Sequence, residues 1–268
     1  MTIPTRLQGL EALDKMFKQA NDEGRAAFLP YFPIGFPNYD ASLAAIEAMA
    51  DVGVDGFEIG IPFSDPLADG PTIQEATQIA LQNGTTVQHC LDAVSTLRNK
   101  GIDQPMMLMG YANPLIAYGI ERFIKAAKDA GADGLIVPDL PPEEASMFAD
   151  SCAREGLALI FFLAPTSNDK RIDLVAENAS GFIYVLSLVG ITGARDQMAT
   201  DLQDFIGRIR QKTNTPLVLG FGISKPEHVK SLHGLVNGFI VGSALVRAGK
   251  ESTETVRILA QSLREATH

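Results

Sequence analysis

The sequence has few of the features that mark secreted or membrane-embedded proteins. Its 268 residues include only two cysteines, Cys90 and Cys152, which is too few to indicate a disulfide framework. No apolar run is long enough to cross a bilayer. The first 17 residues lack the basic-then-apolar layout of a signal peptide. We therefore expect a cytoplasmic protein.

Positive charge is also scarce. The 32 acidic side chains outnumber the 22 basic ones, which gives a net charge of −10, and no cluster of lysine and arginine stands out. Binding to nucleic acid or to an anionic membrane depends on such clusters, so we expect neither partner. A small phosphorylated ligand stays compatible with this charge, because backbone amides alone can hold one phosphate.

What the sequence does contain is a regular alternation of short apolar runs and amphipathic segments. Apolar residues spaced i, i+3, i+4 and i+7 predict helices around 120–127 and 145–152. The eight apolar runs, which predict strands, are 26–34, 56–61, 105–110, 134–137, 158–162, 182–187, 216–219 and 238–241. No linker or low-complexity stretch interrupts this pattern, so we expect residues 1–268 to form one domain.

Eight strand–helix units over this length predict a (β/α)8 TIM barrel, to which we add an N-terminal helix near residues 6–20. A doubly wound open sheet is the alternative, because alternation alone fits both folds. A weak internal repeat favours the barrel. The segments 51–59, 129–137 and 237–241 share one pattern, which 180–184 follows more faintly. All four belong to even-numbered strands, and alternate strands of a barrel fill shared layers of its interior.

Glu58 is an acid inside one of these apolar runs. Because side chains alternate along a strand, Phe57 and Ile59 face the outer helices and Glu58 faces the barrel interior. The repeat has Ile136 and Ile240 at the same position. A structural ion pair is one interpretation, since buried acids are usually paired, but no predicted strand contains lysine or arginine. An unpaired carboxyl in an apolar interior has a raised pKa, which suits a general acid/base.

Two further carboxylates follow on the loop after the second predicted strand. Barrel active sites are built from loops at this end of the strands. Asp65 and Asp69 precede Pro66 and Gly70, which are also typical turn positions. We expect a turn role for Asp65 and leave both interpretations open for Asp69. For Asp139, after the fourth strand, we expect a structural or interfacial role.

Glycine-rich loops follow the seventh and eighth predicted strands. They are "GFGIS" (220–224) and "VGSAL" (241–245), and barrels commonly bind phosphate at these two places. Glycine permits close backbone approach, and the start of a helix after Gly242 favours an anion. We therefore expect a phosphate site between the loops, to which Ser243 adds a hydroxyl. The glycines of "GITGAR" (190–195) predict either a mobile lid or an ordinary surface loop.

Several chemistries are disfavoured by what is missing. The predicted strands contain no lysine for a Schiff base, and the four histidines take part in no cluster with metal-ligand spacing. No dinucleotide-binding fingerprint is present. What remains is acid–base chemistry on a phosphorylated substrate, without a metal or a cofactor, and the residues do not identify that substrate.

The segment "FEIGIPFSDPLADGPTIQEA" (57–76) resembles the signature segment of the tryptophan synthase α subunit family. Further matches along nearly the whole chain are "AAFLPYFPIGFP", "MGYANPL", "PDLPPEE", "APTS", "GITGAR", "GFGIS" and "VGSAL". The resemblance implies a (β/α)8 barrel that cleaves indole-3-glycerol phosphate to indole and glyceraldehyde 3-phosphate in tryptophan biosynthesis. It also implies a chain without a cofactor of its own, in an α2β2 complex with a pyridoxal-phosphate β subunit that receives the indole.

The resemblance assigns roles to individual residues. Glu58 is the general acid/base, Asp69 holds the indole N–H, and Tyr184 is an active-site tyrosine near the glutamate. The other positions that match substrate binding, most of them at the phosphate, are Gly193, Phe221, Gly222, Gly242 and Ser243. The internal repeat would turn Ile183 inward instead of Tyr184. We expect Tyr184, because a slip of one residue inverts the faces of a strand.

In the implied reaction, protonation of indole C3 makes the ring an electron sink, so cleavage of the C–C bond needs neither lysine nor metal. Asp69 stabilises the positive charge that develops on the ring nitrogen. Deprotonation of the glycerol hydroxyl then completes a retro-aldol cleavage.

Two positions depart from the family pattern. Phe36 stands where many members have an acid, so we expect Asp40 to cap the next helix, and Leu188 stands where some have an arginine. Three other functions stay open: a stand-alone lyase, a catalytically weak scaffold that activates a β-type partner, and a phosphate-binding barrel of another kind, such as an isomerase. The presence of both Glu58 and Asp69 favours the lyase over the scaffold, and the full-length resemblance favours it over the isomerase.

Overall fold

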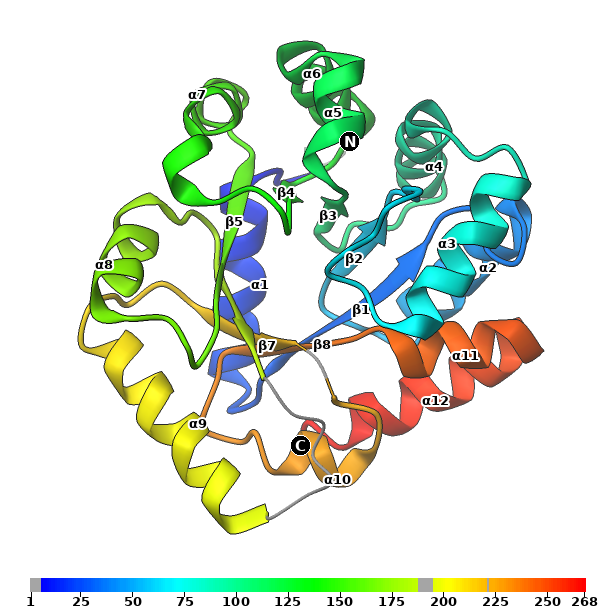
Figure 1. Cartoon of the computed structure of the whole chain (residues 1–268). Coiled ribbons are helices and arrows are strands. Elements are labelled where there is room, and N and C mark those ends of the chain that lie inside the picture. The colour runs from blue at the N-terminus through cyan, green and yellow to red at the C-terminus, as the bar shows by residue number, and fades with distance from the viewer. Residues whose placement is uncertain (1–5, 188–194, 221) are drawn as a thin grey trace, which may run out of the picture.

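The computed structural model describes residues 6–187, 195–220 and 222–268, with the backbone alone for 195–200. In these residues, eight parallel strands close into a barrel in sequence order, with helices around it (Figure 1). The predicted TIM barrel is confirmed, and the open sheet is wrong. The strands are β1 (Ala27–Pro33), β2 (Phe57–Gly60), β3 (Met106–Met109), β4 (Gly134–Ile136), β5 (Ala158–Leu163), β6 (Ile183–Leu186), β7 (Leu217–Gly220) and β8 (Gly238–Val241).

The helices that precede, separate and follow the strands include the two predicted from apolar spacing. They are α1 (Leu10–Asp22), α2 (Tyr39–Asp51), α3 (Pro71–Gln82), α4 (Val87–Asn99), α5 (Ala112–Tyr118), α6 (Ile120–Ala130), a 3-10 turn η1 (Pro142–Glu144), α7 (Ser146–Glu155), α8 (Asp169–Asn178), α9 (Arg195–Arg210), α10 (Pro226–Lys230), α11 (Ser243–Glu251) and α12 (Thr253–Glu265). Within the described ranges, no helix combines the length and the apolar character that crossing a membrane requires.

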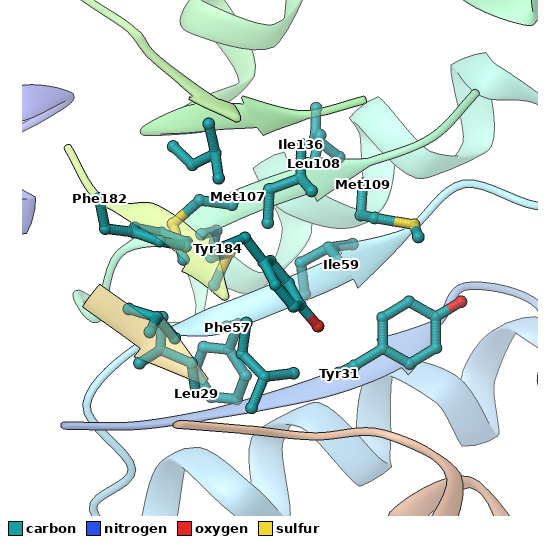
Figure 2. Packing of buried hydrophobic residues seen from close by; sticks show 14 of the residues in the cluster. Leu29, Tyr31, Phe57, Ile59, Met107, Leu108, Met109, Ile136, Phe182 and Tyr184 are labelled. Carbon is teal, nitrogen blue, oxygen red and sulfur yellow. The ribbon is translucent and has the colours of Figure 1, made fainter. Parts of the chain in front are cut away.

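The strands read as continuous apolar runs because both of their faces are covered. Every residue of β2, β3, β7 and β8 is buried, one face against the helices and the other inside the barrel, as is typical of parallel sheets. Figure 2 shows the inside of this packing around β1, β2 and β3.

The added N-terminal helix is present, but it begins later than expected. α1 starts at Leu10 and not near residue 6. Gly9 has φ of 67°, outside the helical region, and a Cβ built there would lie 1.9 Å from the Gly156 carbonyl oxygen. This close approach fixes the chain just before the helix. From there α1 runs inside the ring of outer helices, against one end of the barrel (Figure 1).

The internal repeat has a physical basis at that end of the barrel. A polar side chain just before each even-numbered strand accepts a hydrogen bond from a backbone N–H at the start of the preceding strand. The pairs are Asp55 with Phe28 (2.8 Å), Asp133 with Met106 (2.9 Å), Ser180 with Leu159 (2.9 Å) and Asn237 with Leu217 (2.9 Å). The glycine that follows this side chain leaves room for α1 in three of the four repeats. A Cβ there would lie 2.9–3.4 Å from Met16, Leu13 or Phe17.

The repeat misplaces β6 by one residue. In β2 the backbone N–H of Phe57, two residues after Asp55, donates to the neighbouring strand's segment at Pro105. In β6 the corresponding donor is Ile183, three residues after Ser180, so β6 is shifted by one residue in the repeat. Gly181, with φ of 78°, takes up the extra residue. Tyr184, and not Ile183, therefore occupies the position that corresponds to Glu58, as the family resemblance predicts.

The predicted cap of α2 is wrong. Asn38 caps this helix, because its side chain accepts a hydrogen bond from the backbone N–H of Ala41 at 2.9 Å, and Asp40 lies within the first turn. Phe36, the departure from the family pattern, is 3% exposed and packs beside Phe32. An apolar side chain at this position joins the core.

Asp133 joins four segments at the α1 end of the barrel. Its side chain is fully buried and forms ion pairs with Arg6 at 3.2 Å and Arg98 at 2.7 Å. It also accepts hydrogen bonds from the backbone N–H groups of Gly9 at 2.8 Å and Met106 at 2.9 Å. The carboxylate thus ties the chain before α1 to α4 and β3.

We expect Asp133→Asn to lower the free energy of unfolding by about 3–5 kcal/mol, the usual effect of breaking a buried ion pair on one side. The amide cannot accept from four donors and leaves both guanidinium groups without an anion. Thermal melting measures the loss. Asp129→Asn is the matched control, because that carboxylate is exposed and, among the described residues, pairs with Lys125 alone. The melting temperature of this variant should stay close to the parent's. A parent-like melt for Asp133→Asn would contradict the assigned role.

Candidate active site

A cavity of about 660 Å³ lies where the strands end and their following loops meet. Six of the predicted site residues line it, and they come from β2, the β2–α3 loop, β6 and the loops after β7 and β8. They are Glu58, Asp69, Tyr184, Gly222, Gly242 and Ser243. The structure thus brings these residues together, while their roles stay predictions.

Some predicted residues fall outside the described part of the chain. These are Gly193, Phe221 and Leu188. Of the segment for which a lid was one prediction (190–195), residues 190–194 also lie outside it, and Arg195 is the first residue of α9.

Glu58 is held at the inner wall of the cavity by β2. It is 2% exposed, and none of the described residues forms a hydrogen bond or ion pair with its carboxyl group. Burial, together with the negative charge of Asp69, raises the pKa of Glu58 to about 8. The carboxyl is therefore protonated at neutral pH and can donate a proton into the cavity.

Asp69 reaches the same cavity from the β2–α3 loop. Its carboxylate accepts a hydrogen bond from the Tyr111 hydroxyl, with 3.0 Å between the two oxygens. Burial raises the pKa of Asp69 to about 6, and the hydrogen bond from Tyr111 acts in the opposite direction. Near pH 7 the site thus holds one neutral carboxylic acid and one carboxylate. Such a separation of two pKa values is typical of paired acid–base groups.

The rings of Tyr31 and Tyr184 lie near Glu58. Each ring has room because the strand next to its own carries a glycine, Gly60 on β2 or Gly220 on β7. A Cβ at Gly60 would lie 2.4 Å from the Tyr31 hydroxyl, and a Cβ at Gly220 would lie 2.2 Å from the Tyr184 ring. Tyr31 pairs with Glu58 across the β1–β2 ladder. Figure 2 shows the Tyr184 hydroxyl pointing toward the Tyr31 ring across the barrel interior.

The remaining wall next to the two acids is largely apolar. The Phe162 ring stacks on Tyr184 with 4.7 Å between ring centroids, and Ile73, Met109 and Ile240 complete this side of the cavity. A flat aromatic ligand matches these rings and aliphatic side chains.

The part of the cavity formed by the loops after β7 and β8 has the features of an anion site. Gly222, with φ of 82°, belongs to the loop after β7, and Ser243 is the first residue of α11. The first N–H groups of a helix have no partner within the helix and attract anions. Arg247 lies one turn further along α11 and is the only basic residue among the described residues that line the cavity. Its guanidinium donates to the Thr72 hydroxyl at 3.2 Å.

The other loop carboxylates lie away from the cavity. Asp65 is exposed and accepts a hydrogen bond from the Ser64 hydroxyl, and Asp139 accepts from the backbone N–H of Ala112 at 2.9 Å. Both positions agree with the structural roles expected for them. Within the described ranges, no group of three or more His, Cys, Asp or Glu side chains could hold a metal ion.

Sequence reasoning missed three residues at this site. Arg247 carried a signal, because it follows Ser243 by four residues and so shares its helix face. Tyr31 carried a weaker one, as an aromatic residue with a polar end inside an apolar run. Tyr111 carried none, because its contact with Asp69 joins residues 42 positions apart in the chain.

Known proteins resemble this chain in sequence and in structure. A family model described as tryptophan synthase alpha chain matches residues 17–268. The tryptophan synthase alpha chain of Roseiflexus sp. (strain RS-1) is 48% identical over 237 residues, which cover 88% of this chain and 91% of that protein. Tryptophan synthase of Saccharomyces cerevisiae is 42% identical over 248 residues, 92% of this chain but 35% of that protein. A crystal structure of M. tuberculosis tryptophan synthase, in an aminoacrylate-bound form, matches with a TM-score of 0.88 and 33% identity over 96% of this chain and 99% of that one. The chain belongs to the tryptophan synthase alpha chain family.

Proposed function

We propose that this chain cleaves indole-3-glycerol phosphate into indole and glyceraldehyde 3-phosphate, as the α subunit of a tryptophan synthase. The observation that carries the proposal is the pair of acids in one cavity. Glu58 is buried without a partner among the described residues, and Asp69 is held beside it at a lower pKa. A member of this family with a degenerate site would have no reason to keep that pair, so a scaffold role is not favoured.

We propose one orientation for the substrate in the cavity. We place the phosphate at Gly222, Gly242 and Ser243, where backbone N–H groups and the start of α11 favour an anion, with Arg247 as a nearby cation. The indole ring then lies against Tyr184 and the apolar wall, so that its N–H meets Asp69. The glycerol chain between the two ends lies beside Glu58.

Proton transfer by Glu58 drives the proposed cleavage. Its carboxylic acid donates a proton to indole C3, and the positive charge that appears on the ring nitrogen is stabilised by the Asp69 carboxylate. Glu58, now a carboxylate, takes the proton of the glycerol hydroxyl. The C–C bond breaks as that oxygen becomes the aldehyde oxygen, and its electron pair restores the neutral indole. Protons balance, and Glu58 returns to its starting form.

This scheme asks for no cofactor from the chain, because the protonated indole ring itself accepts the electrons. Pyridoxal phosphate belongs, in our proposal, to a partner β subunit that receives the indole in an α2β2 complex. Three large apolar side chains support a partner at the site's end of the barrel. Leu67, Ile116 and Met147 are 92%, 54% and 62% exposed, on segments that follow β2, β3 and β4, and we propose them as candidates for contact with that partner.

Two broader expectations stay predictions. We propose that residues 1–268 form one domain, since β1 pairs with β8 and so joins the early and late parts of the chain. We propose the cytoplasm as the compartment, since Cys90 and Cys152 are both free and buried.

A bulky side chain at Gly242 should weaken binding of phosphorylated ligands. A Cβ there would already touch the Tyr31 ring at 3.4 Å, so the two methyl groups of Gly242→Val would crowd either that ring or the phosphate. We expect affinity for glycerol 3-phosphate to fall by about tenfold or more. Calorimetric titration measures it. Gly207→Val on α9, where a Cβ would meet nothing within 4 Å, is the control, and equal affinity in both variants would show that the site is misplaced.

Indole release tests the proposed function directly. The purified chain is incubated with indole-3-glycerol phosphate, with and without a β subunit, and free indole is measured. We expect release in both cases and faster release with the partner. Equal rates would indicate a stand-alone lyase. No release in either case would contradict the proposal.

A further inference from the structure

Tyr111 makes three contacts with the loop that carries Asp69. It lies just after β3, where its backbone begins α5, and it is 3% exposed. Its ring packs against Phe63 with 5.4 Å between centroids. Its hydroxyl oxygen accepts the backbone N–H of Ala68 at 2.9 Å and donates to the Asp69 carboxylate at 3.0 Å. The Tyr111 side chain thus contacts the β2–α3 loop both near its start, at Phe63, and at Ala68 and Asp69 beside the cavity.

We propose that Tyr111 is the positioning residue for Asp69. The hydroxyl of Tyr111 orients the Asp69 carboxylate toward the indole N–H. The inference rests on the proposed function. In the described structure Tyr111 is the only side chain that donates a hydrogen bond to this carboxylate, and no arginine or lysine pairs with it. Leu67, two residues before Asp69, is 92% exposed. The loop holds Asp69 through its backbone, whose N–H donates to the Pro66 carbonyl at 3.0 Å and whose carbonyl accepts from the Gln74 side chain at 2.8 Å, so these bonds do not orient the carboxylate.

The hydroxyl also affects the charge of Asp69. The groups that face this carboxylate around the cavity are Glu58, Tyr31, Tyr184 and Tyr111. Arg247 also lines the cavity, but its guanidinium donates to Thr72 and forms no ion pair with Asp69 among the described residues. Glu58 and the two inner tyrosines are neutral near pH 7, so the hydrogen bond from Tyr111 is the main local feature that favours the charged form. Without it, burial would raise the pKa of Asp69 further, and a smaller fraction would be ionised at pH 6–7.

The test is Tyr111→Phe, which keeps the ring on Phe63 and removes only the hydroxyl. We expect single-turnover cleavage of indole-3-glycerol phosphate to slow by about 10–100-fold, the range for losing a hydrogen bond to a charged group. The acidic limb of kcat/KM should move to higher pH, while the melting temperature stays near the parent's. Tyr118→Phe is the matched control. Tyr118 ends α5, and its hydroxyl donates to the Gln88 side chain on α4 at 2.9 Å. Loss of this hydroxyl should leave the rate and the pH profile unchanged.

A double variant separates positioning from general support. If Tyr111 acts through Asp69, then Tyr111→Phe should cost little further rate in an Asp69→Asn background. A loss of the same factor in both backgrounds would overturn the inference, and so would a parent-like rate and pH profile for Tyr111→Phe. Failure of the proposed function would look different, because the parent chain itself would then release no indole.

Discussion

Replacing Glu58 with glutamine should slow single-turnover cleavage of indole-3-glycerol phosphate by about 10³–10⁴-fold or more, at or beyond the upper end for general acid–base groups. Glutamine keeps the shape of the side chain but cannot donate a proton to indole C3 or take one from the glycerol hydroxyl. Both proton transfers of the proposed cleavage are therefore lost. Substrate affinity should change little, because glutamine keeps the shape of the side chain and the proposed phosphate contacts lie in the loops after β7 and β8.

The same variant should fold at least as well as the parent. Folding raises the pKa of Glu58 from about 4.5 to about 8, so the folded state binds the proton more tightly than the unfolded state does. The carboxyl therefore opposes folding increasingly as the pH rises from about 4.5 to about 8, and by a constant amount above that. Glutamine stays neutral, so its melting temperature at pH 8.5 should equal or exceed the parent's.

A purely structural acid would behave in the opposite way. Its replacement would lower the melting temperature and leave turnover within a few-fold of the parent's. Glu47→Gln is the matched control, because that carboxylate lies on the outside of α2 and pairs with Lys100. It should change neither turnover nor melting.

Asp69→Asn should slow cleavage by about 10²–10³-fold, comparable to removing one electrostatic contact to a charge that develops in the transition state. Asparagine can still accept the indole N–H, but it carries no charge to stabilise the protonated ring. The loss should therefore appear in kcat more than in KM. Asp65→Asn, four residues earlier on the same loop but exposed, should stay within a few-fold of the parent. An equal effect of both variants would contradict the role assigned to Asp69.

Much of this architecture was predictable because it depends on local pattern. The barrel was predictable from apolar runs that are buried on both faces. Glu58 was identified because the internal repeat has isoleucine, Ile136 or Ile240, at the corresponding position of two other strands. The meeting of Gly222, Gly242 and Ser243 at one cavity was predictable because loops after consecutive strands of a barrel must meet at the same end. Each of these inferences needs only the period of a strand and the topology of the fold.

What escaped prediction depends on contacts that no local pattern encodes. The repeat alone would have assigned the inward and outward faces of β6 the wrong way round. Gly181 accommodates one extra residue before this strand, and the sequence does not distinguish such a glycine from those at the same position of the other repeats. The late start of α1 depends on a contact between Gly9 and Gly156. The contact of Tyr111 with Asp69 is of the same kind, since it depends on the path of a loop between two strands.

The pH dependence of kcat/KM for indole release tests the central claim most directly, because it reports the ionisation of the free enzyme. We expect activity to fall below an apparent pKa near 6, where Asp69 becomes protonated, and above one near 8, where Glu58 loses its proton. The substrate phosphate also titrates near 6, so the alkaline limb is decisive. A fall in rate centred near pH 8 would support proton donation by Glu58, whereas a rate that stays constant from pH 7 to beyond pH 9 would contradict it.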